Sequence, residues 1–279
     1  MLFTKGHGTG NDFVILEDPD GALELTPALV AALCDRRRGI GADGVLRVVR
    51  SAKHPDGAGH AGEAEWFMDY RNADGSIAEM CGNGVRVFVR YLVERGLATP
   101  GADLPVGTRA GVVRAQVDGS LISVHMRTPE VYAAGTATVG QLTFPGVAVD
   151  CGNPHLVCGV HDGLPLGSLD LHVAPGYDPA LFPDGVNVEF TTVGDPIEGA
   201  DMHMHMRVYE RGSAETLSCG SGALAVGAVA LRDAGLRAGV VAVDLPGGRL
   251  TVTFDGSSWR LAGPAVLVAT GEVDPAALA

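Results

Sequence analysis

Residues 80–84 read Met-Cys-Gly-Asn-Gly, and residues 218–222 read Ser-Cys-Gly-Ser-Gly. The cysteines of these two stretches, Cys81 and Cys219, lie 138 positions apart (219 − 81). Each cysteine is followed by a stretch with helical spacing of apolar residues that ends at a glycine. Each thiol is therefore expected at the N-terminus of a helix, where free backbone N–H groups can lower the pKa of a cysteine.

Other landmarks repeat at nearly the same distance. Residues 111–119 begin with glycine and end in Asp-Gly, as residues 248–256 do. The Gly-Asn pairs at 10–11 and 152–153 also begin similar segments. The shared order and spacing predict an internal duplication whose repeat has the size of a domain.

The duplication predicts two domains of ordinary size. We expect an N-terminal half over residues 1–130 and a C-terminal half over residues 131–264. A last strand within residues 265–279 could return to the first half. Each half shows several strands, mostly joined by hairpins, and one long helix, which is typical of the α+β class. We expect two pseudo-symmetric domains, each with a mostly antiparallel or mixed sheet around its central helix.

Local signals place the other elements. A helix is expected over residues 26–36, with Thr26 as N-cap and Pro27 in the first turn. Residues 53–63 are rich in Gly, His and Ala and are expected to form an exposed loop. One hairpin is expected over residues 112–126, and a second is expected to turn at Asp255-Gly256. Further strands are expected at residues 11–16, 45–50, 156–160, 186–192, 202–209, 240–244 and 265–270.

Composition excludes several classes of function. The chain has 279 residues and a net charge of −13, which argues against a nucleic-acid partner. We expect no secretory signal and no membrane span. The five cysteines include no Cys-x-x-Cys pair, so neither a disulfide framework nor a zinc site is indicated, and a cytoplasmic location is expected. No dinucleotide or P-loop motif is present.

Two thiols at two helix N-termini could invert a stereocentre. Backbone N–H groups of Gly82, Asn83, Gly220 and Ser221 could hold a carboxylate, because the first turn of a helix is an anion site. One thiolate would remove the α-proton, and the opposite thiol would deliver a proton to the other face. Such a reaction needs no cofactor, so we expect none, and no metal.

The motifs resemble those of the diaminopimelate epimerase family over essentially the whole chain. The segments that carry this resemblance are residues 5–13, 71–76, 80–86, 152–155, 186–189, 210–212 and 218–222. The resemblance implies a diaminopimelate epimerase-like fold. It also implies a cofactor-independent isomerase that converts LL-2,6-diaminoheptanedioate to its meso form in lysine and peptidoglycan precursor synthesis. A small-molecule amino-acid substrate and a homodimer are implied as well.

The resemblance also assigns roles to residues. It implies that Cys81 and Cys219 are the two acid/base thiols, and that His155 and Glu210 tune them. The residues implied to bind the substrate, through side chains or backbone, are Asn11, Asn72, Gly82, Asn83, Asn153, Asn187, Glu210, Arg211, Gly220 and Ser221. A guanidinium and several amides would suit a substrate with a second amino-acid end.

Two positions depart from the pattern. Some members of the family carry glutamine where Gly44 stands, so that contact is missing. Ala214 stands where glycine is common, which predicts strain if this position needs a positive φ. Separately, His203 and His205 alternate with methionines along an expected strand. A metal site is conceivable there, but a half-solvated strand is the favoured interpretation.

Other functions remain open at this point. A proline racemase type of the same superfamily tends to have histidine two positions after the first cysteine, where this chain has Asn83. A hydrolase could use Cys81 or Cys219 with His155, but one of the two cysteine motifs would then have no role. A non-catalytic amino-acid-binding protein would not need both thiols.

Overall fold

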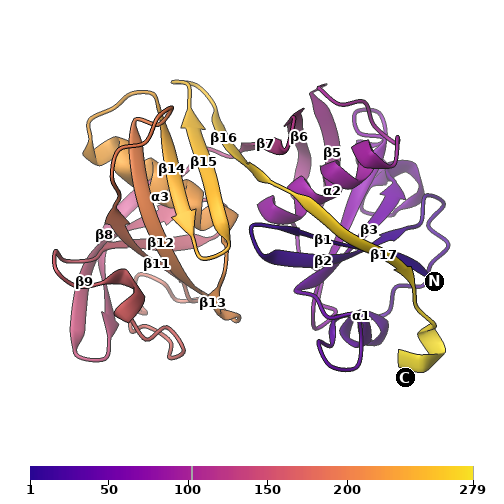
Figure 1. Cartoon of the computed structure of the whole chain (residues 1–279), viewed down its shortest axis with the longest axis horizontal. Helices are drawn as coiled ribbons and strands as arrows, with labels where there is room; N and C mark the ends of the chain where they lie inside the picture. Colours follow the sequence, from indigo (N-terminus) through magenta and orange to yellow (C-terminus); the bar gives the residue numbers. More distant parts are fainter. Residues whose placement is uncertain (102, 279) are drawn as a thin grey trace. The chain divides into compact units, whose positions relative to one another are not determined.

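The computed structural model of the chain describes residues 1–101 and 103–278 and divides into two compact units. Unit 1 comprises Met1–His125 together with Gly263–Ala279, and unit 2 comprises Met126–Ala262. Figure 1 colours the chain from indigo at the N-terminus to yellow at the C-terminus, so unit 1 contains both ends of the colour scale. Each unit is a mixed sheet that packs against one long helix.

Unit 1 is built on a sheet in which neighbouring strands pair in the order β17-β1-β2-β3-β4-β5-β6-β7. The pairs β2–β3 and β4–β5 are parallel, and the other pairs are antiparallel. The strands are β1 Leu2–Gly8, β2 Asn11–Glu17, β3 Gly44–Arg50, β4 Trp66–Asn72, β5 Leu104–Thr108, β6 Gly111–Asp118, β7 Leu121–Met126 and β17 Val266–Glu272.

Unit 2 repeats this order as β8-β9-β10-β11-β12-β14-β15-β16. Its parallel pairs, β10–β11 and β12–β14, occupy the same places in the order. The short β13 adds to β12. The strands are β8 Glu130–Val139, β9 Leu142–Asp150, β10 Pro154–Gly159, β11 Asn187–Val193, β12 Met202–Glu210, β13 Ala214–Thr216, β14 Gly239–Leu245, β15 Gly248–Phe254 and β16 Trp259–Pro264.

The matched strand order confirms the predicted duplication. The central helices also correspond: α2, Gly82–Glu94, contacts the sheet of unit 1, and α3, Gly220–Asp233, contacts that of unit 2. One strand of unit 1 comes from the far end of the chain, because β17 pairs antiparallel with β1, as Figure 1 shows in yellow. In this order β17 occupies the place that β8 has in unit 2.

The helices are buried for different reasons. In α2, Val85, Phe88 and Leu92 recur at helical spacing and are fully buried, while Glu94 is exposed. Most of α3 is buried and small, which lets its backbone approach the sheet. A Cβ atom at Gly227 would lie 2.6 Å from Val252 on β15, so only glycine fits there without movement.

Most predicted elements are confirmed. The short helix α1, Pro27–Cys34, begins after Thr26, whose side chain accepts the N–H of Leu29, as the capping pattern predicts. The interpretation of residues 53–63 as a loop was incomplete, because the short 3-10 helix η2, Ala58–His60, lies within it and η1, Ser51–Lys53, overlaps its start. The strands β1, β4, β5, β8, β9 and β13 were not predicted.

Among the described residues, no helix is both long and apolar enough to cross a membrane.

Candidate active site

Cys81 is the N-cap of α2, as the sequence predicts. Its backbone is extended (φ −139°, ψ 118°), and its Sγ accepts the N–H of Gly84 at 3.4 Å. The thiol also lies 3.6 Å from Oδ1 of Asn11, which follows the turn between β1 and β2. The turn thus brings Asn11 to the helix N-terminus that carries Cys81.

A polar network surrounds this first cysteine. Asn83 donates from Nδ2 to Oδ1 of Asn11 at 3.2 Å, and Asn11 donates to Asp43 at 2.8 Å. The fully buried Arg86 donates to Oδ1 of Asn83 at 2.9 Å and to the hydroxyl of Thr9 at 3.2 Å. Burial lowers the pKa of Arg86 to about 10, and the charge of a Cys81 thiolate acts in the opposite direction.

Asn72 lies at the end of β4 and donates to the hydroxyl of Ser76 at 3.0 Å. Across the sheet it pairs with Gly44 on β3. A Cβ atom at Gly44 would lie 2.5 Å from the carbonyl oxygen of Arg71 and 2.7 Å from the ring of Tyr70. The glycine is therefore required by close packing in this chain, so a glutamine at this position would need different neighbouring residues.

Cys219 is the N-cap of α3 and has nearly the same backbone conformation as Cys81 (φ −124°, ψ 114°). Its Sγ lies 3.6 Å from the hydroxyl of Ser221, and the residue is only 5% exposed. Burial raises the pKa of this thiol well above its usual value, and the charges of Glu210 and Glu189 raise it further. Two similar helix starts therefore surround their thiols with different charges.

His155 and Glu189 form a buried pair below α3. Both side chains are fully buried, and Nδ1 of His155 lies 2.6 Å from Oε1 of Glu189. Nε2 of the same ring lies 3.2 Å from Oδ1 of Asn153. Burial raises the pKa of Glu189, while the charge of His155 lowers it. Both ring nitrogens of His155 thus face partners other than a cysteine, which argues against the hydrolase alternative.

Glu189 is absent from the residues predicted from the sequence, where only His155 and Glu210 are expected to tune the thiols. In the structure Glu210 accepts a hydrogen bond from the hydroxyl of Thr216, and its charge raises the pKa of Cys219. A signal for Glu189 was present: it lies two residues after Asn187 on one strand, so both side chains face the same side of the sheet.

Arg211 lies just beyond β12 and is held through its backbone. Its N–H donates to Oδ1 of Asn187 at 2.9 Å, and its guanidinium donates to the carbonyl oxygen of Asp184 at 2.7 Å. Ala214, in the adjoining turn, has a φ of +61°, so the expected left-handed conformation is present. The alanine is consequently strained where glycine would not be.

The remaining cysteines are buried away from these helix starts. Burial raises the pKa of Cys34 to about 11 and that of Cys158 to about 12, and it also raises the pKa of Cys151. Thiols in such surroundings are protonated at neutral pH and unreactive.

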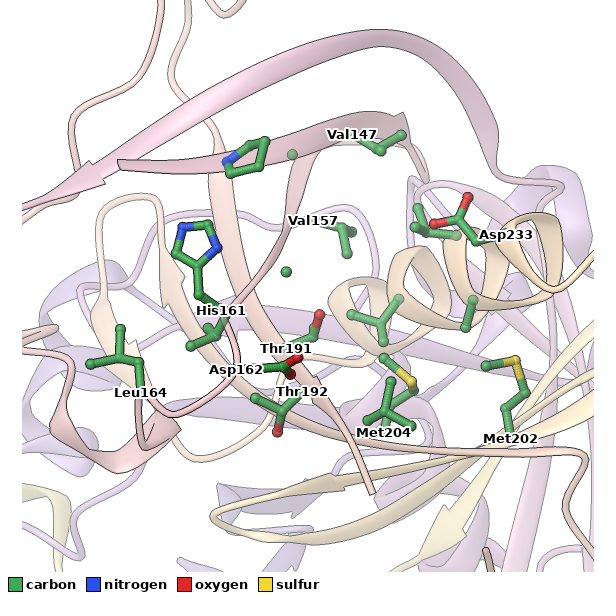
Figure 2. Close-up of a pocket in the computed structure, with 18 of the residues that line it drawn as sticks. Val147, Val157, His161, Asp162, Leu164, Thr191, Thr192, Met202, Met204 and Asp233 are labelled. Carbon is green, nitrogen blue, oxygen red and sulfur yellow. The ribbon is translucent and has the colours of Figure 1, made fainter. Parts of the chain in front are cut away.

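Unit 2 also contains a cavity of about 550 Å³, which Figure 2 shows. It lies against the C-terminal half of α3, at Val229 and Asp233, and against Val157, Thr191 and Met204 of the sheet. Cys219 begins the same helix at its other end and does not line this cavity. The cavity is therefore separate from the thiol of unit 2.

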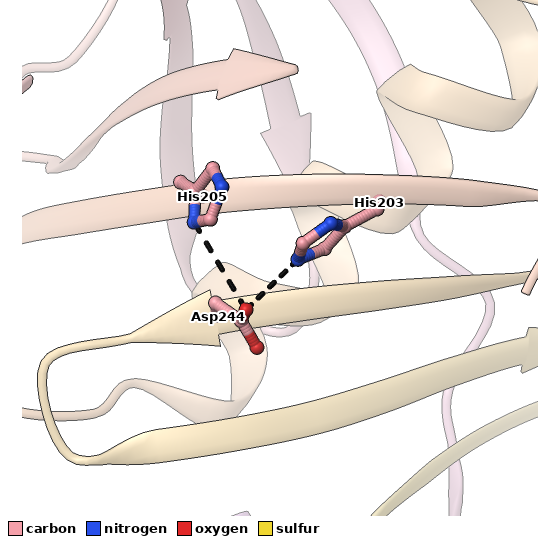
Figure 3. A group of neighbouring side chains, drawn as sticks. All are labelled: His203, His205 and Asp244. Atoms are coloured by element: carbon pink, nitrogen blue, oxygen red, sulfur yellow. Dashed lines mark hydrogen bonds and ion pairs between the residues drawn. The ribbon is translucent and has the colours of Figure 1, made fainter. Parts of the chain in front are cut away.

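His203, His205 and Asp244 form the group in Figure 3, with ligand atoms within 4.8 Å of one another. Nε2 of His203 lies 2.8 Å from the Asp244 carboxylate, and Nδ1 of the same ring lies 2.7 Å from the carbonyl oxygen of Asp195. These side chains could hold a divalent metal. Arg249 already donates to both oxygens of Asp244, however, and balances its charge.

Together, these features define a class of protein. Two equivalent helices in duplicated units each begin at a cysteine. Cys81 is accompanied by the amide of Asn11 and the charge of Arg86, and Cys219 by Ser221 and the charge of Glu189. A thiol at a helix N-terminus is suited to remove or return a proton. The duplicated fold, with one such thiol in each unit, is that of a racemase or epimerase.

Comparison with known proteins agrees with this class. The chain matches the diaminopimelate epimerase family over residues 3–132 and 147–274. It is 50% identical to the diaminopimelate epimerase of Mycolicibacterium smegmatis, covering 99% of this chain and 97% of that protein. It is also 50% identical to the enzyme of Thermobifida fusca, with full coverage of both chains. The chain belongs to the diaminopimelate epimerase family and is an isomerase.

Solved structures share the fold at low sequence identity. A phenazine biosynthesis protein of the PhzF family from Bacillus anthracis superposes with a TM-score of 0.72 at 20% identity, covering 98% of each chain. A probable proline racemase from Agrobacterium radiobacter superposes with a TM-score of 0.69 at 17% identity, covering 99% of this chain and 95% of that one. These likenesses confirm the predicted α+β architecture.

Proposed function

We propose that the chain converts LL-2,6-diaminoheptanedioate to the meso isomer, with Cys81 and Cys219 as acid and base. The observation that carries this proposal is the placement of both cysteines as N-caps of corresponding helices in duplicated units. The relatives named above are diaminopimelate epimerases over nearly their whole length, which supports the choice of substrate. We infer that the two compact units are the two halves of the epimerase.

The proposed reaction moves one proton in and one proton out. A cysteine thiolate takes the α-proton, so the C–H bond breaks, an S–H bond forms, and the electron pair stays on the α-carbon and its carboxylate. The opposite thiol then gives its proton to the other face of that carbon and becomes a thiolate. N–H groups of Gly82, Asn83, Gly220 and Ser221 would stabilise the added negative charge.

The remaining residues would recognise the substrate. Asn11 lies beside Cys81 and Asn153 beside His155, and their amides can both donate and accept. Asn72, Asn187 and Arg211, with Glu210, would hold the distal amino-acid end. The Arg211 guanidinium suits a carboxylate, and its backbone is already fixed by Asn187.

Deuterium uptake tests this function. The enzyme is incubated with the LL isomer in deuterated water, and label at the α-carbon and meso product are followed together, with proline as a parallel substrate. We expect exchange and meso product from the LL isomer and none from proline. Exchange with proline alone would instead favour a proline racemase.

We further propose a cytoplasmic homodimer. Light scattering of the purified chain at several concentrations would give twice the mass of 28.7 kDa if this is so. A single-chain mass at all concentrations would exclude the dimer.

A further inference from the structure

The duplication allows one half of the chain to serve as an internal comparison for the other. Asn11 and Asn153 begin the equivalent segments, so Phe13 corresponds to His155. Phe13 pairs with Gly44 on the next parallel strand, and His155 pairs with Asn187 at the equivalent place.

Leu46 lies two residues after Gly44 on β3, and Glu189 lies two residues after Asn187 on β11, so Leu46 of unit 1 corresponds to Glu189 of unit 2. An apolar pair, Phe13 and Leu46, therefore stands where unit 2 has His155 and Glu189. All four side chains are at most 1% exposed.

These paired residues lie under the first turn of each helix. A Cβ atom at Gly84, three residues after Cys81, would meet Leu46 at 3.4 Å and Phe13 at 3.6 Å. At the equivalent Gly222, it would lie 2.7 Å from Oε1 of Glu189. Glu189 thus puts a carboxyl group against the helix turn that follows Cys219, where unit 1 has only hydrocarbon.

Unit 1 has a buried positive charge near its cysteine, at Arg86. Arg86 lies five residues after Cys81, and the equivalent residue five positions after Cys219 is Leu224. Both are fully buried. The Nε and Nη1 atoms of Arg86 have no hydrogen-bond partner among the described residues, and one carboxylate oxygen of Glu189 has none either. Each half therefore contains a buried, incompletely paired charge, with opposite signs.

We propose that Glu189 and Arg86 are positioning residues that decide which thiol is charged in the resting enzyme. Arg86 favours the thiolate of Cys81, and Glu189, whose carboxyl group is held by His155, keeps Cys219 as the thiol. This inference rests on the proposed two-thiol function and adds the cause of its asymmetry. The helix N-termini act on both sulfurs alike, so the buried charges account for the difference in pKa between the two thiols.

Further groups that the structure describes near the thiols can be compared in the same way. Glu210 of β12 adds negative charge near Cys219, and Ser221 is neutral. Beside Cys81, the amide of Asn11 is neutral and donates from Nδ2 to Asp43, whose carboxylate is paired with Arg36. The resting enzyme would thus begin with Cys81 as base and Cys219 as acid, and each turnover in this direction would leave the charges reversed.

The test measures each thiol alone. Cys219 is titrated in a Cys81→Ser chain, and Cys81 in a Cys219→Ser chain, by thiolate ultraviolet absorbance and by alkylation located with mass spectrometry. Glu189→Gln removes the charge with little change of shape. A second variant, His155→Phe with Glu189→Leu, copies the pair that packs under the same helix turn in unit 1. Arg86→Leu places in unit 1 the leucine that unit 2 has at the equivalent position, Leu224.

We expect the apparent pKa of Cys219 to fall by about one unit in Glu189→Gln, so that its alkylation at neutral pH becomes about tenfold faster. The double variant should shift it in the same direction. Arg86→Leu should reduce the thiolate fraction of Cys81 by a similar factor. Glu189→Gln should leave the titration of Cys81 unchanged.

An unchanged titration of Cys219 in both folded unit 2 variants would overturn the proposal. So would a resting thiolate on Cys219 in the otherwise unaltered chain. The proposed function fails separately, through absence of α-proton exchange in the unaltered enzyme. Thiol titration needs no substrate, so the two failures are distinguishable.

Discussion

At the scale of single residues, the two cysteines occupy the same backbone position and differ in their surroundings. Cys81 is accompanied by a buried guanidinium, and Cys219 by the buried carboxyl group of Glu189 and the half-buried one of Glu210. Since the pKa of Cys219 is raised, its thiolate should appear only as the pH rises above the usual range for a cysteine. Its alkylation should therefore be slow at neutral pH and accelerate in alkali.

Arg211→Lys tests recognition of the substrate. Lysine keeps the charge and loses the planar set of donors that suits a carboxylate. Hydrogen bonds to charged groups contribute roughly 1.5–3 kcal/mol, so we expect KM to rise by roughly tenfold to a hundredfold with a smaller effect on kcat. Steady-state kinetics with the LL isomer measure this.

Arg237→Lys is the matched control, because Arg237 is exposed in the loop after α3. An equal change of KM in both variants would contradict a specific role of Arg211.

Sequence reasoning predicted the cysteines and their neighbours because each motif is local. The side chains of Cys81, Asn83 and Arg86 are related by one helix, and Cys219 and Ser221 by another. The contact of His155 with Glu189 joins residues 34 positions apart on parallel strands. Strand register decides such a contact, and no turn or capping signal encodes it.

At the scale of elements, the first turns of α2 and α3 allow a matched test of packing. Gly84→Ala places a Cβ atom at ordinary contact distance and improves helix propensity, so stability should be unchanged or rise by up to ~1 kcal/mol. Gly222→Ala drives a Cβ atom against the Glu189 carboxyl and should lower stability by roughly 1–3 kcal/mol. Urea unfolding measures both, and equal effects would contradict the described packing.

Ala214 provides a second test at this scale. Its φ of +61° is unfavourable for an alanine by roughly 1–2 kcal/mol, while glycine loses more chain entropy on folding. We expect Ala214→Gly to raise stability by about 0.5–1 kcal/mol. The midpoint of urea unfolding should increase without a change of slope. A lower midpoint would show that the turn holds alanine without strain.

Elements with clear end signals were predicted, and those without were missed. Thr26-Pro27 marks the start of α1, and Asp-Gly marks two hairpin turns. The hairpin of β8 and β9 turns at Gly140 and carries a proline within its second strand, at Pro145. An internal proline argues against a strand, which explains why this hairpin was not predicted from the sequence.

At the scale of the whole molecule, the two ends of the chain meet in unit 1, where β17 pairs with β1. Ending the chain after residue 264 removes this strand and leaves β1 paired only with β2, so that β1 becomes an unpaired edge of the sheet. We expect unit 1 to lose its cooperative unfolding transition and to exchange its amide hydrogens rapidly. Hydrogen exchange read by mass spectrometry would show this, and protection of β1 and β2 equal to that in the full chain would contradict it.

The duplication was visible in the sequence because glycines and cysteines recur in order. The pairing partner of the last strand was left open, since a strand at the end of a chain can pair with any exposed edge of matching length. The structure resolves this by pairing Phe3 with Gly271 in the register of β1 and β17.

The most direct test of the two-thiol account is α-deuterium incorporation from the LL isomer by three forms of the enzyme. The unaltered chain should incorporate label and form the meso product. Cys81→Ser and Cys219→Ser should each lose at least about a thousandfold of epimerisation, because a hydroxyl is a far weaker base than a thiolate. Full epimerisation by either variant would contradict the account.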